Sequence, residues 1–170
     1  MNRQQLATKL AMDALGLPVQ MGAFDDRLVL QKAIYLAQAS GLKLGYYFQW
    51  YLRGPYCSDL ASDGFAIAAE TAEQEVDQSS SWKLDDCSRQ RLQAVRPLVG
   101  GGSGTELARW LELLASVHFL VDRKQAQRSS RRIAERLNRL GKSFSENEVE
   151  RAVQELSKHG LVKGVRQSRN

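Results

Sequence analysis

The chain has 170 residues and a net charge of +5, and its 43% hydrophobic and 25% charged residues are typical of an ordinary globular domain. No segment approaches the roughly 18 consecutive apolar residues of a membrane span, the polar amphipathic start is unlike a secretory signal, and two cysteines are too few for a disulfide framework. These features exclude a membrane protein, a disordered or collagen-like chain and a cysteine-rich zinc protein, and they favour a cytoplasmic location.

Two helices are predicted at the beginning of the chain. The first covers residues 3–15, where apolar residues recur at helical spacing, and ends at Gly16. The second opens at Asp25 and Asp26, whose carboxylates suit a helix start, and runs to Ser40. Its apolar residues cover a wide face, so we expect it to pack on more than one neighbour. The residues expected on its opposite, polar face are Arg27, Gln31, Tyr35 and Gln38.

An aromatic strand is predicted over residues 46–52, because aromatic residues there alternate in a period of two. Residues 53–56, Arg-Gly-Pro-Tyr, have the composition of a turn. A helix should follow to about Thr71, with Gly64 at a point of close approach. A short second strand over residues 82–84 is predicted to pair with the aromatic strand.

Four further helices are predicted over residues 86–96, 105–121, 129–140 and 145–160. The helix over residues 105–121 is apolar almost all round, so we expect it at the centre of the protein. Only a thin polar strip interrupts its apolar surface, formed by Arg109, Glu112 and Ser116.

The sequence therefore predicts a mainly α fold, a helical bundle of about seven helices with a small two-stranded antiparallel β element. Four glycines in residues 100–104 mark a linker and divide the chain. The expected parts are an N-terminal helical part, the glycine-rich linker, a C-terminal helical part that shares the core and a basic tail, at residues 1–99, 100–104, 105–162 and 163–170.

Residues suited to catalysis are scarce. His118 shares the apolar face of the central helix, which indicates a hydrogen-bonded core histidine, and His159 ends a helix. Neither histidine stands at metal-ligand spacing from a cysteine or carboxylate. Cys57 and Cys87 have no sequence partner that would activate a thiolate. We therefore expect a protein that is not an enzyme and that needs no cofactor or metal.

The first candidate site is the aromatic strand with its turn, namely Tyr47, Tyr51, Arg53 and Tyr56. Tyrosine and arginine dominate the energetics of protein interfaces because they combine large contact area with directional hydrogen bonds. The alternative is that the rings form the core and that Arg53 pairs with a carboxylate such as Asp59.

The second candidate site is an arginine-rich helix in the basic half of the chain. Residues 86–170 hold seventeen Lys and Arg against nine Asp and Glu, whereas residues 1–85 hold seven against ten. At 100° per residue, an arc of about 140° on the helix contains five arginines. These are Arg128, Arg131, Arg132, Arg136 and Arg139. Such a face can contact phosphates, although Glu135 lies within it; the alternative is a solvated surface.

Residues 27–63 resemble a known family. Residues 27–36 read Arg-Leu-Val-Leu-Gln-Lys-Ala-Ile-Tyr-Leu, the aromatic strand follows, and residues 53–63 read Arg-Gly-Pro-Tyr-Cys-Ser-Asp-Leu-Ala-Ser-Asp. This pattern is similar to the YwgA-like family of small bacterial proteins and, more distantly, to the Panacea domain, the SocA-like antitoxin domain. Cys57 stands where the family pattern has a serine.

The resemblance implies a binding role. YwgA-like proteins have no established activity, whereas Panacea domains neutralise varied toxins, often near phage or mobile elements. The working hypothesis is a non-enzymatic interaction protein in an antitoxin-like or phage-associated setting that binds a toxin or regulatory protein. A homo-oligomer is also compatible with the sequence. The rival hypothesis is a nucleic-acid-binding transcriptional regulator that uses the arginine-rich helix.

Overall fold

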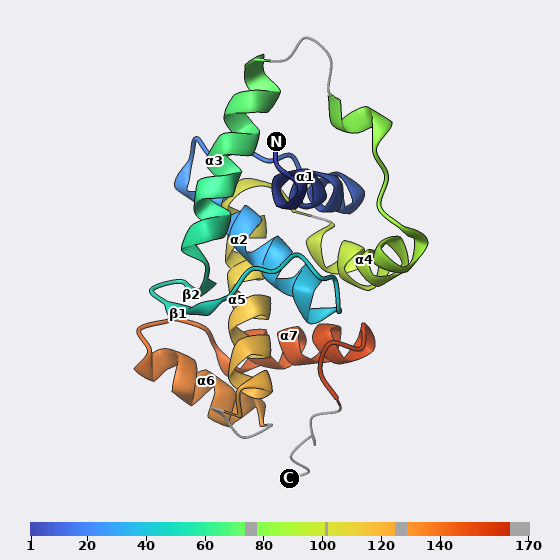
Figure 1. Cartoon of the computed structure of the whole chain (residues 1–170). Coiled ribbons are helices and arrows are strands. Elements are labelled where there is room, and N and C mark those ends of the chain that lie inside the picture. The colour runs from blue at the N-terminus through green and yellow to red at the C-terminus, as the bar shows by residue number, and fades with distance from the viewer. Residues whose placement is uncertain (74–77, 101, 125–128, 164–170) are drawn as a thin grey trace.

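The computed structural model describes residues 1–73, 78–100, 102–124 and 129–163, and this part of the chain confirms the mainly α prediction. It contains seven α-helices and one two-stranded antiparallel sheet (Figure 1). Arg128 and the basic tail beyond residue 163 lie outside the described residues. None of the described helices combines the length and apolar character needed to cross a bilayer.

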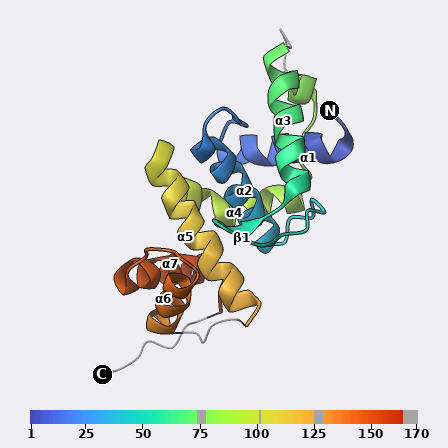
Figure 2. The same ribbon diagram turned by 90° about the vertical axis from the view of Figure 1, so that its left-hand side faces the viewer.

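Helix α5 (Gly104–Asp122) is the central element, as its sequence predicts. Leu111, Leu114 and Leu120 are fully buried along it. Its most extensive contact is with helix α2 (Phe24–Ala39), and it also contacts the sheet and the last two helices. Figure 2 shows α5 running from beside α2 and α4 to α6 and α7. The polar strip predicted on α5 is not a solvated surface throughout, because Glu112 and Ser116 are buried.

Three more helices complete the N-terminal part around α2: α1 (Arg3–Leu15), α3 (Ser58–Glu73) and α4 (Asp86–Val99). Helix α3 packs closely on α2 at Gly64, where a β-carbon would clash with the side chain of Leu30. Gly64 therefore marks a close approach, as predicted from the sequence.

The C-terminal helices α6 (Ser130–Arg139) and α7 (Glu146–Lys158) pack on each other and on α5. Ser145 caps α7 by accepting a hydrogen bond from the Glu148 amide, while Glu148 accepts one from the Ser145 amide. The loop between the helices returns to α5 and carries Lys142, a buried cation.

The sheet is a hairpin of strands β1 (Gln49–Tyr51) and β2 (Gly54–Tyr56), so the prediction that residues 82–84 supply the second strand is wrong. Gly54 has φ +83°, a left-handed conformation that lets the chain reverse immediately after Tyr51. The first strand is also shorter than predicted. The side-chain amide of Gln38 bonds both backbone polar groups of Tyr46, at 2.9 and 3.0 Å, in place of a strand partner.

The expected polar face of α2 is largely buried, because the segment after β2 and helix α5 cover it. The side chain of Gln31 donates to the Cys57 carbonyl at 2.8 Å and accepts from the Cys57 amide at 2.9 Å. Tyr35 is likewise buried, against α5. These side chains form hydrogen bonds inside the protein. Sequence periodicity identifies a polar face, but it does not tell whether that face bonds water or buried protein groups.

Candidate functional site

Large apolar side chains that remain exposed gather around the hairpin. Within the described ranges, seven large hydrophobic side chains are exposed, and six of them belong to the hairpin or to the chain and helices beside it. These six are Phe24, Tyr47, Tyr51, Leu52, Tyr56 and Phe65. The seventh, Trp82, lies outside this group. Clustered exposed apolar surface is typical of interaction sites, whereas single exposed residues are ordinary.

The three tyrosines predicted from the sequence are accessible. The exposed fractions of Tyr47, Tyr51 and Tyr56 are 70%, 58% and 37%, so these rings do not form the core. The Tyr51 and Tyr56 rings lie 5.5 Å apart between centroids. The buried rings of this segment are those of Tyr46 and Phe48.

A groove of about 420 Å³, here called the hairpin groove, runs between the hairpin, the start of α2 and the start of α3. It is lined by Met21, Phe24, Arg27, Leu28, Gln31, Lys32, Tyr51, Leu52, Arg53, Tyr56, Ala61 and Phe65. Most of this lining is apolar, it includes three cations, and it contains no Asp or Glu. The groove is large enough for one or two side chains of a partner.

Arg53 pairs with a carboxylate other than the one suggested by the sequence. Its Nη1 lies 3.1 Å from Oε2 of Glu112 on α5, so the pairing with Asp59 is wrong. The guanidinium also lies 5.7 Å from the centroid of the Phe24 ring. Arg53 therefore anchors the turn to α5 through Glu112, while the exposed 59% of its side chain is open to the groove that it lines.

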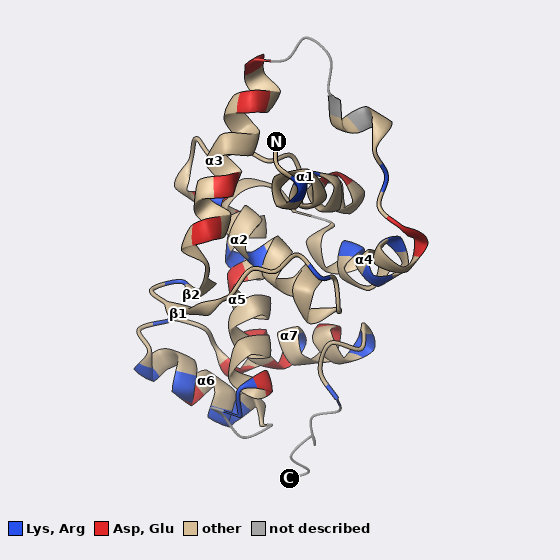
Figure 3. Cartoon of the chain, viewed as in Figure 1, with Lys and Arg blue, Asp and Glu red and all other residues tan. Residues whose placement is uncertain are grey.

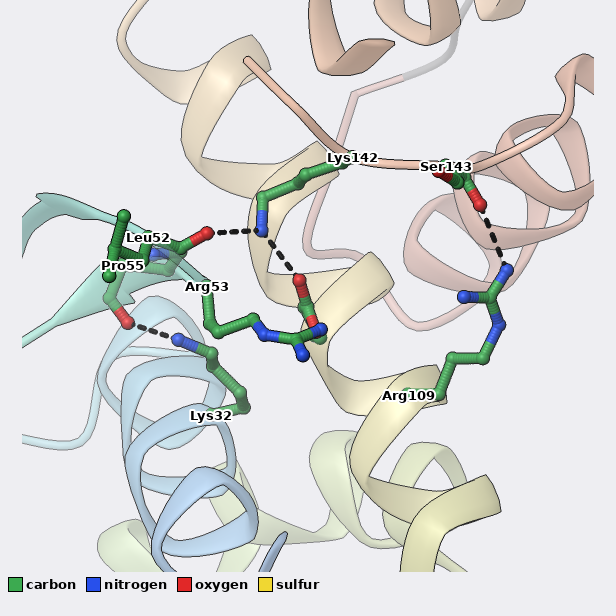
Figure 4. Close-up of polar contacts among 8 residues, drawn as sticks. Lys32, Leu52, Arg53, Pro55, Arg109, Lys142 and Ser143 are labelled. Carbon is green, nitrogen blue, oxygen red and sulfur yellow. Dashed lines mark hydrogen bonds and ion pairs between the residues drawn. The ribbon is translucent and has the colours of Figure 1, made fainter. Parts of the chain in front are cut away.

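Two buried lysines hold the backbone of the hairpin from opposite sides (Figure 4). Lys32 of α2 donates to the Pro55 carbonyl at 2.6 Å. Lys142, from the loop between α6 and α7, donates to the Leu52 carbonyl at 3.2 Å and to Oε1 of Glu112 at 2.5 Å. The hairpin is therefore fixed by segments that lie far apart in the sequence.

The cluster formed by Lys32, Arg53, Lys142 and Glu112, here called the charge cluster, has three cations and one carboxylate. Burial lowers the pKa of Lys32 to about 7, and the nearby charges of Lys142 and Arg53 act in the same direction. Burial also lowers the pKa of Lys142, although its hydrogen bond to Glu112 opposes this effect. The charge of Glu112 acts in the opposite direction but does not offset burial and the two neighbouring cations.

The hairpin also rests directly on α5 at Gly54. A β-carbon there would clash with Oγ of Ser116, a buried hydroxyl with no hydrogen-bond partner in the described structure. Gly54 thus meets two requirements, a left-handed backbone and close contact with a helix.

His118 and Cys57 are both buried. Tyr35 and His118 share a 2.7 Å hydrogen bond between Oη and Nδ1, and burial lowers the pKa of His118. His118 is therefore a hydrogen-bonded core residue, as its position in the sequence indicates. Cys57 is buried, and no group of three or more metal-binding side chains is found in the described segments.

Basic residues recur along α6 (Figure 3), but the environments of its arginine side chains differ. Arg131 and Arg132 each pair with Glu135 at 3.2 Å, which reduces their net field. Arg139 is exposed, whereas Nε of Arg136 is buried without a hydrogen-bond partner in the described structure. Arg128 is not among the described residues.

Sequence reasoning missed Lys32, Glu112 and Lys142, the buried members of the charge cluster. The sequence could have indicated two of them, because Lys32 and Glu112 are ionisable residues within strongly apolar helical segments. Lys142 follows a helix end and resembles an ordinary loop lysine.

Searches against protein-family models, curated proteins and solved structures find no match to the chain.

Proposed function

We propose that this chain is a non-enzymatic interaction protein that binds a protein partner in the hairpin groove. The observation that carries the proposal is the gathering of six of the seven exposed large apolar side chains around one hairpin. Burying one such side chain contributes roughly 1.5–3 kcal/mol. Tyr51, Tyr56 and Arg53 are also of the residue types that most often act as interface hot spots.

The rigidity of the hairpin supports the same proposal. Lys32 and Lys142 fix its carbonyls, and Arg53 is paired with Glu112. A preorganised surface loses less conformational entropy when it binds. Tyr51 and Leu52 therefore project from a fixed turn.

The biological setting in this proposal comes from the resemblance to the YwgA-like and Panacea families. It is a cytoplasmic, antitoxin-like or phage-associated setting, with a toxin or regulatory protein as the partner. Co-production of the chain with a candidate toxin tests this setting. Growth rescue by the original chain, and its loss with Tyr51→Ala, is the expected result.

Affinity capture tests the binding site. The tagged original chain, Tyr51→Ala, Arg53→Ala and Trp82→Ala are compared for the proteins they retain. Trp82 is the matched control because it is an exposed aromatic residue outside the groove. We expect Tyr51→Ala and Arg53→Ala to lose at least tenfold of a retained partner and Trp82→Ala to keep it. Identical profiles for all four proteins would refute the groove as the site.

The second candidate function is nucleic-acid binding by α6. It is favoured by the exposed side chains of Arg131, Arg132 and Arg139 on one short helix. This candidate predicts retention of DNA or RNA that weakens steeply as salt rises, and loss of retention in Arg132→Glu with Arg139→Glu. Unchanged retention in that double variant would remove it.

A further inference from the structure

The cations of the hairpin groove indicate what kind of partner segment it takes. Arg27, Lys32 and Arg53 line the groove, and no carboxylate does. The guanidinium groups of Arg27 and Arg53 lie 5.9 and 5.7 Å from the centroid of the same ring, Phe24. Positive charge and apolar surface therefore meet at one place.

The nearest carboxylates on the same helix are engaged elsewhere. Asp26 accepts a hydrogen bond from the Ala23 amide at 2.9 Å, and Asp25 accepts one from the Thr105 hydroxyl at 2.7 Å. Arg27 itself donates to the carbonyls of Met21 and Gly22, at 3.0 and 3.1 Å, and makes no ion pair among the described residues.

The single carboxylate of the charge cluster is also fully used. Glu112 accepts from Lys142 through Oε1 and from Arg53 through Oε2, so both of its oxygens are occupied. Lys32 is 2% exposed and bonds only a neutral carbonyl, that of Pro55. An anion in the groove would therefore meet the guanidinium groups of Arg27 and Arg53, and no Asp or Glu of the groove lining would compete for them.

A second hollow beside the hairpin, which shares Tyr51 and Tyr56 with the hairpin groove, differs in charge. It is lined by Tyr47, Tyr51 and Tyr56 but also by Asp59, and by no Lys or Arg. The positive charge is thus specific to the hairpin groove and is not a general property of the aromatic surface.

We infer that the hairpin groove takes an acidic segment of its protein partner, in which a Glu or Asp stands beside an apolar side chain. The apolar side chain lies among Phe24, Tyr51 and Phe65, and the carboxylate contacts Arg53 and Arg27. This inference rests on the proposed function and specifies the chemistry of the partner at the same site.

The probe is a blocked hexapeptide in which two glutamates alternate with phenylalanine and leucine between glycines. Its control carries glutamine in place of both glutamates. Each peptide is titrated into the ¹⁵N-labelled full chain, and backbone amide shifts locate and quantify binding. We expect saturable shifts in residues 51–56 and at the start of α2, with affinity about tenfold or more weaker for the glutamine peptide.

Variants separate the anion contact from the apolar contact. Arg53→Gln and Arg27→Gln should each remove most of the preference for glutamate, while Arg131→Gln on α6 should leave it unchanged. Arg27→Gln provides a second test because Arg53 also holds Glu112, and the amide spectrum of each variant reports whether the fold is intact.

Equal binding of the two peptides, or absence of amide shifts at the groove, would overturn the inference. Tighter binding of a twelve-nucleotide DNA strand at the groove would also overturn it. So would amide shifts that depend on protein concentration without peptide, because they would indicate that a second copy of the chain occupies the groove. If either of the first two occurs while Tyr51→Ala still loses its captured partner, the acidic segment fails and protein binding stands. If Tyr51→Ala also retains the partner, the proposed function fails as well.

Discussion

Replacing Glu112 by glutamine should destabilise the protein strongly, because this carboxylate is the only acid in the charge cluster. The change keeps the size of the side chain but removes its charge from Lys142 and Arg53. Lys142 is buried, so it would be left as an unpaired cation away from water. Removing one member of a buried ion pair costs about 3–5 kcal/mol.

The loss at Arg53 should be small, because its side chain is largely exposed and water can replace Glu112. The expected cost of Glu112→Gln is therefore about 3 kcal/mol, at the lower end for buried pairs. For a chain of this length, that corresponds to a fall in Tm of roughly 6–12 °C. Urea denaturation at neutral pH measures the free energy of unfolding directly.

A double variant gives the sharper result. Glu112→Leu with Lys142→Met removes both charges and replaces them with apolar side chains of similar size. Its cost should be less than the cost of Lys142→Met or Glu112→Leu alone, since no buried charge is left without a partner. A Glu112→Gln cost below about 1 kcal/mol, or a double-variant cost equal to the sum of the single costs, would refute the buried pair.

Three other predictions concern the hairpin and the core. Gly54→Ala should cost more than Gly141→Ala, by about 1–3 kcal/mol, because both glycines have positive φ but only Gly54 contacts another helix; equal falls in Tm would contradict the close packing. Because the pKa of Lys32 is lowered in the folded protein, the unfolded chain binds more protons than the folded one between about pH 7 and 10. The free energy of unfolding should therefore rise with pH in this range, by up to about 1.4 kcal/mol per pH unit. Urea denaturation at pH 7 and pH 9 should show a smaller rise for Lys32→Met, and an unchanged rise would be contrary evidence. Tyr35→Phe should cost about 1–3 kcal/mol by leaving Nδ1 of His118 unbonded, as measured by thermal unfolding, and a neutral effect would show that the bond is not needed.

The helical part of the fold follows from sequence periodicity. Helix α5 was predicted as the centre because nearly all its residues are apolar, and burial along it confirms this. The strand partner was not predicted, because residues 53–56 read as a turn and the pairing depends on Gly54 resting against α5. Local composition does not encode that contact between distant segments.

The candidate site was only partly predictable for a similar reason. Tyr47, Tyr51 and Tyr56 were identified from residue type and alternation, and they are exposed. The partner of Arg53 was not, since Glu112 is distant in sequence and its pairing depends on how α5 packs against the hairpin. Lys142 reaches the hairpin only because α6 and α7 fold back on α5. Such pairings are set by tertiary packing, which one sequence does not reveal.

The most direct test of a docking hairpin is site-specific photo-crosslinking in cells. A photoreactive phenylalanine analogue replaces Tyr51 in one protein and Trp82 in another, two exposed aromatic positions of which only the first lines the groove. Irradiation should yield a distinct, heavier protein adduct from position 51 and none from position 82. The same adducts from both positions, or none from position 51, would contradict the claim that the hairpin groove binds a protein partner.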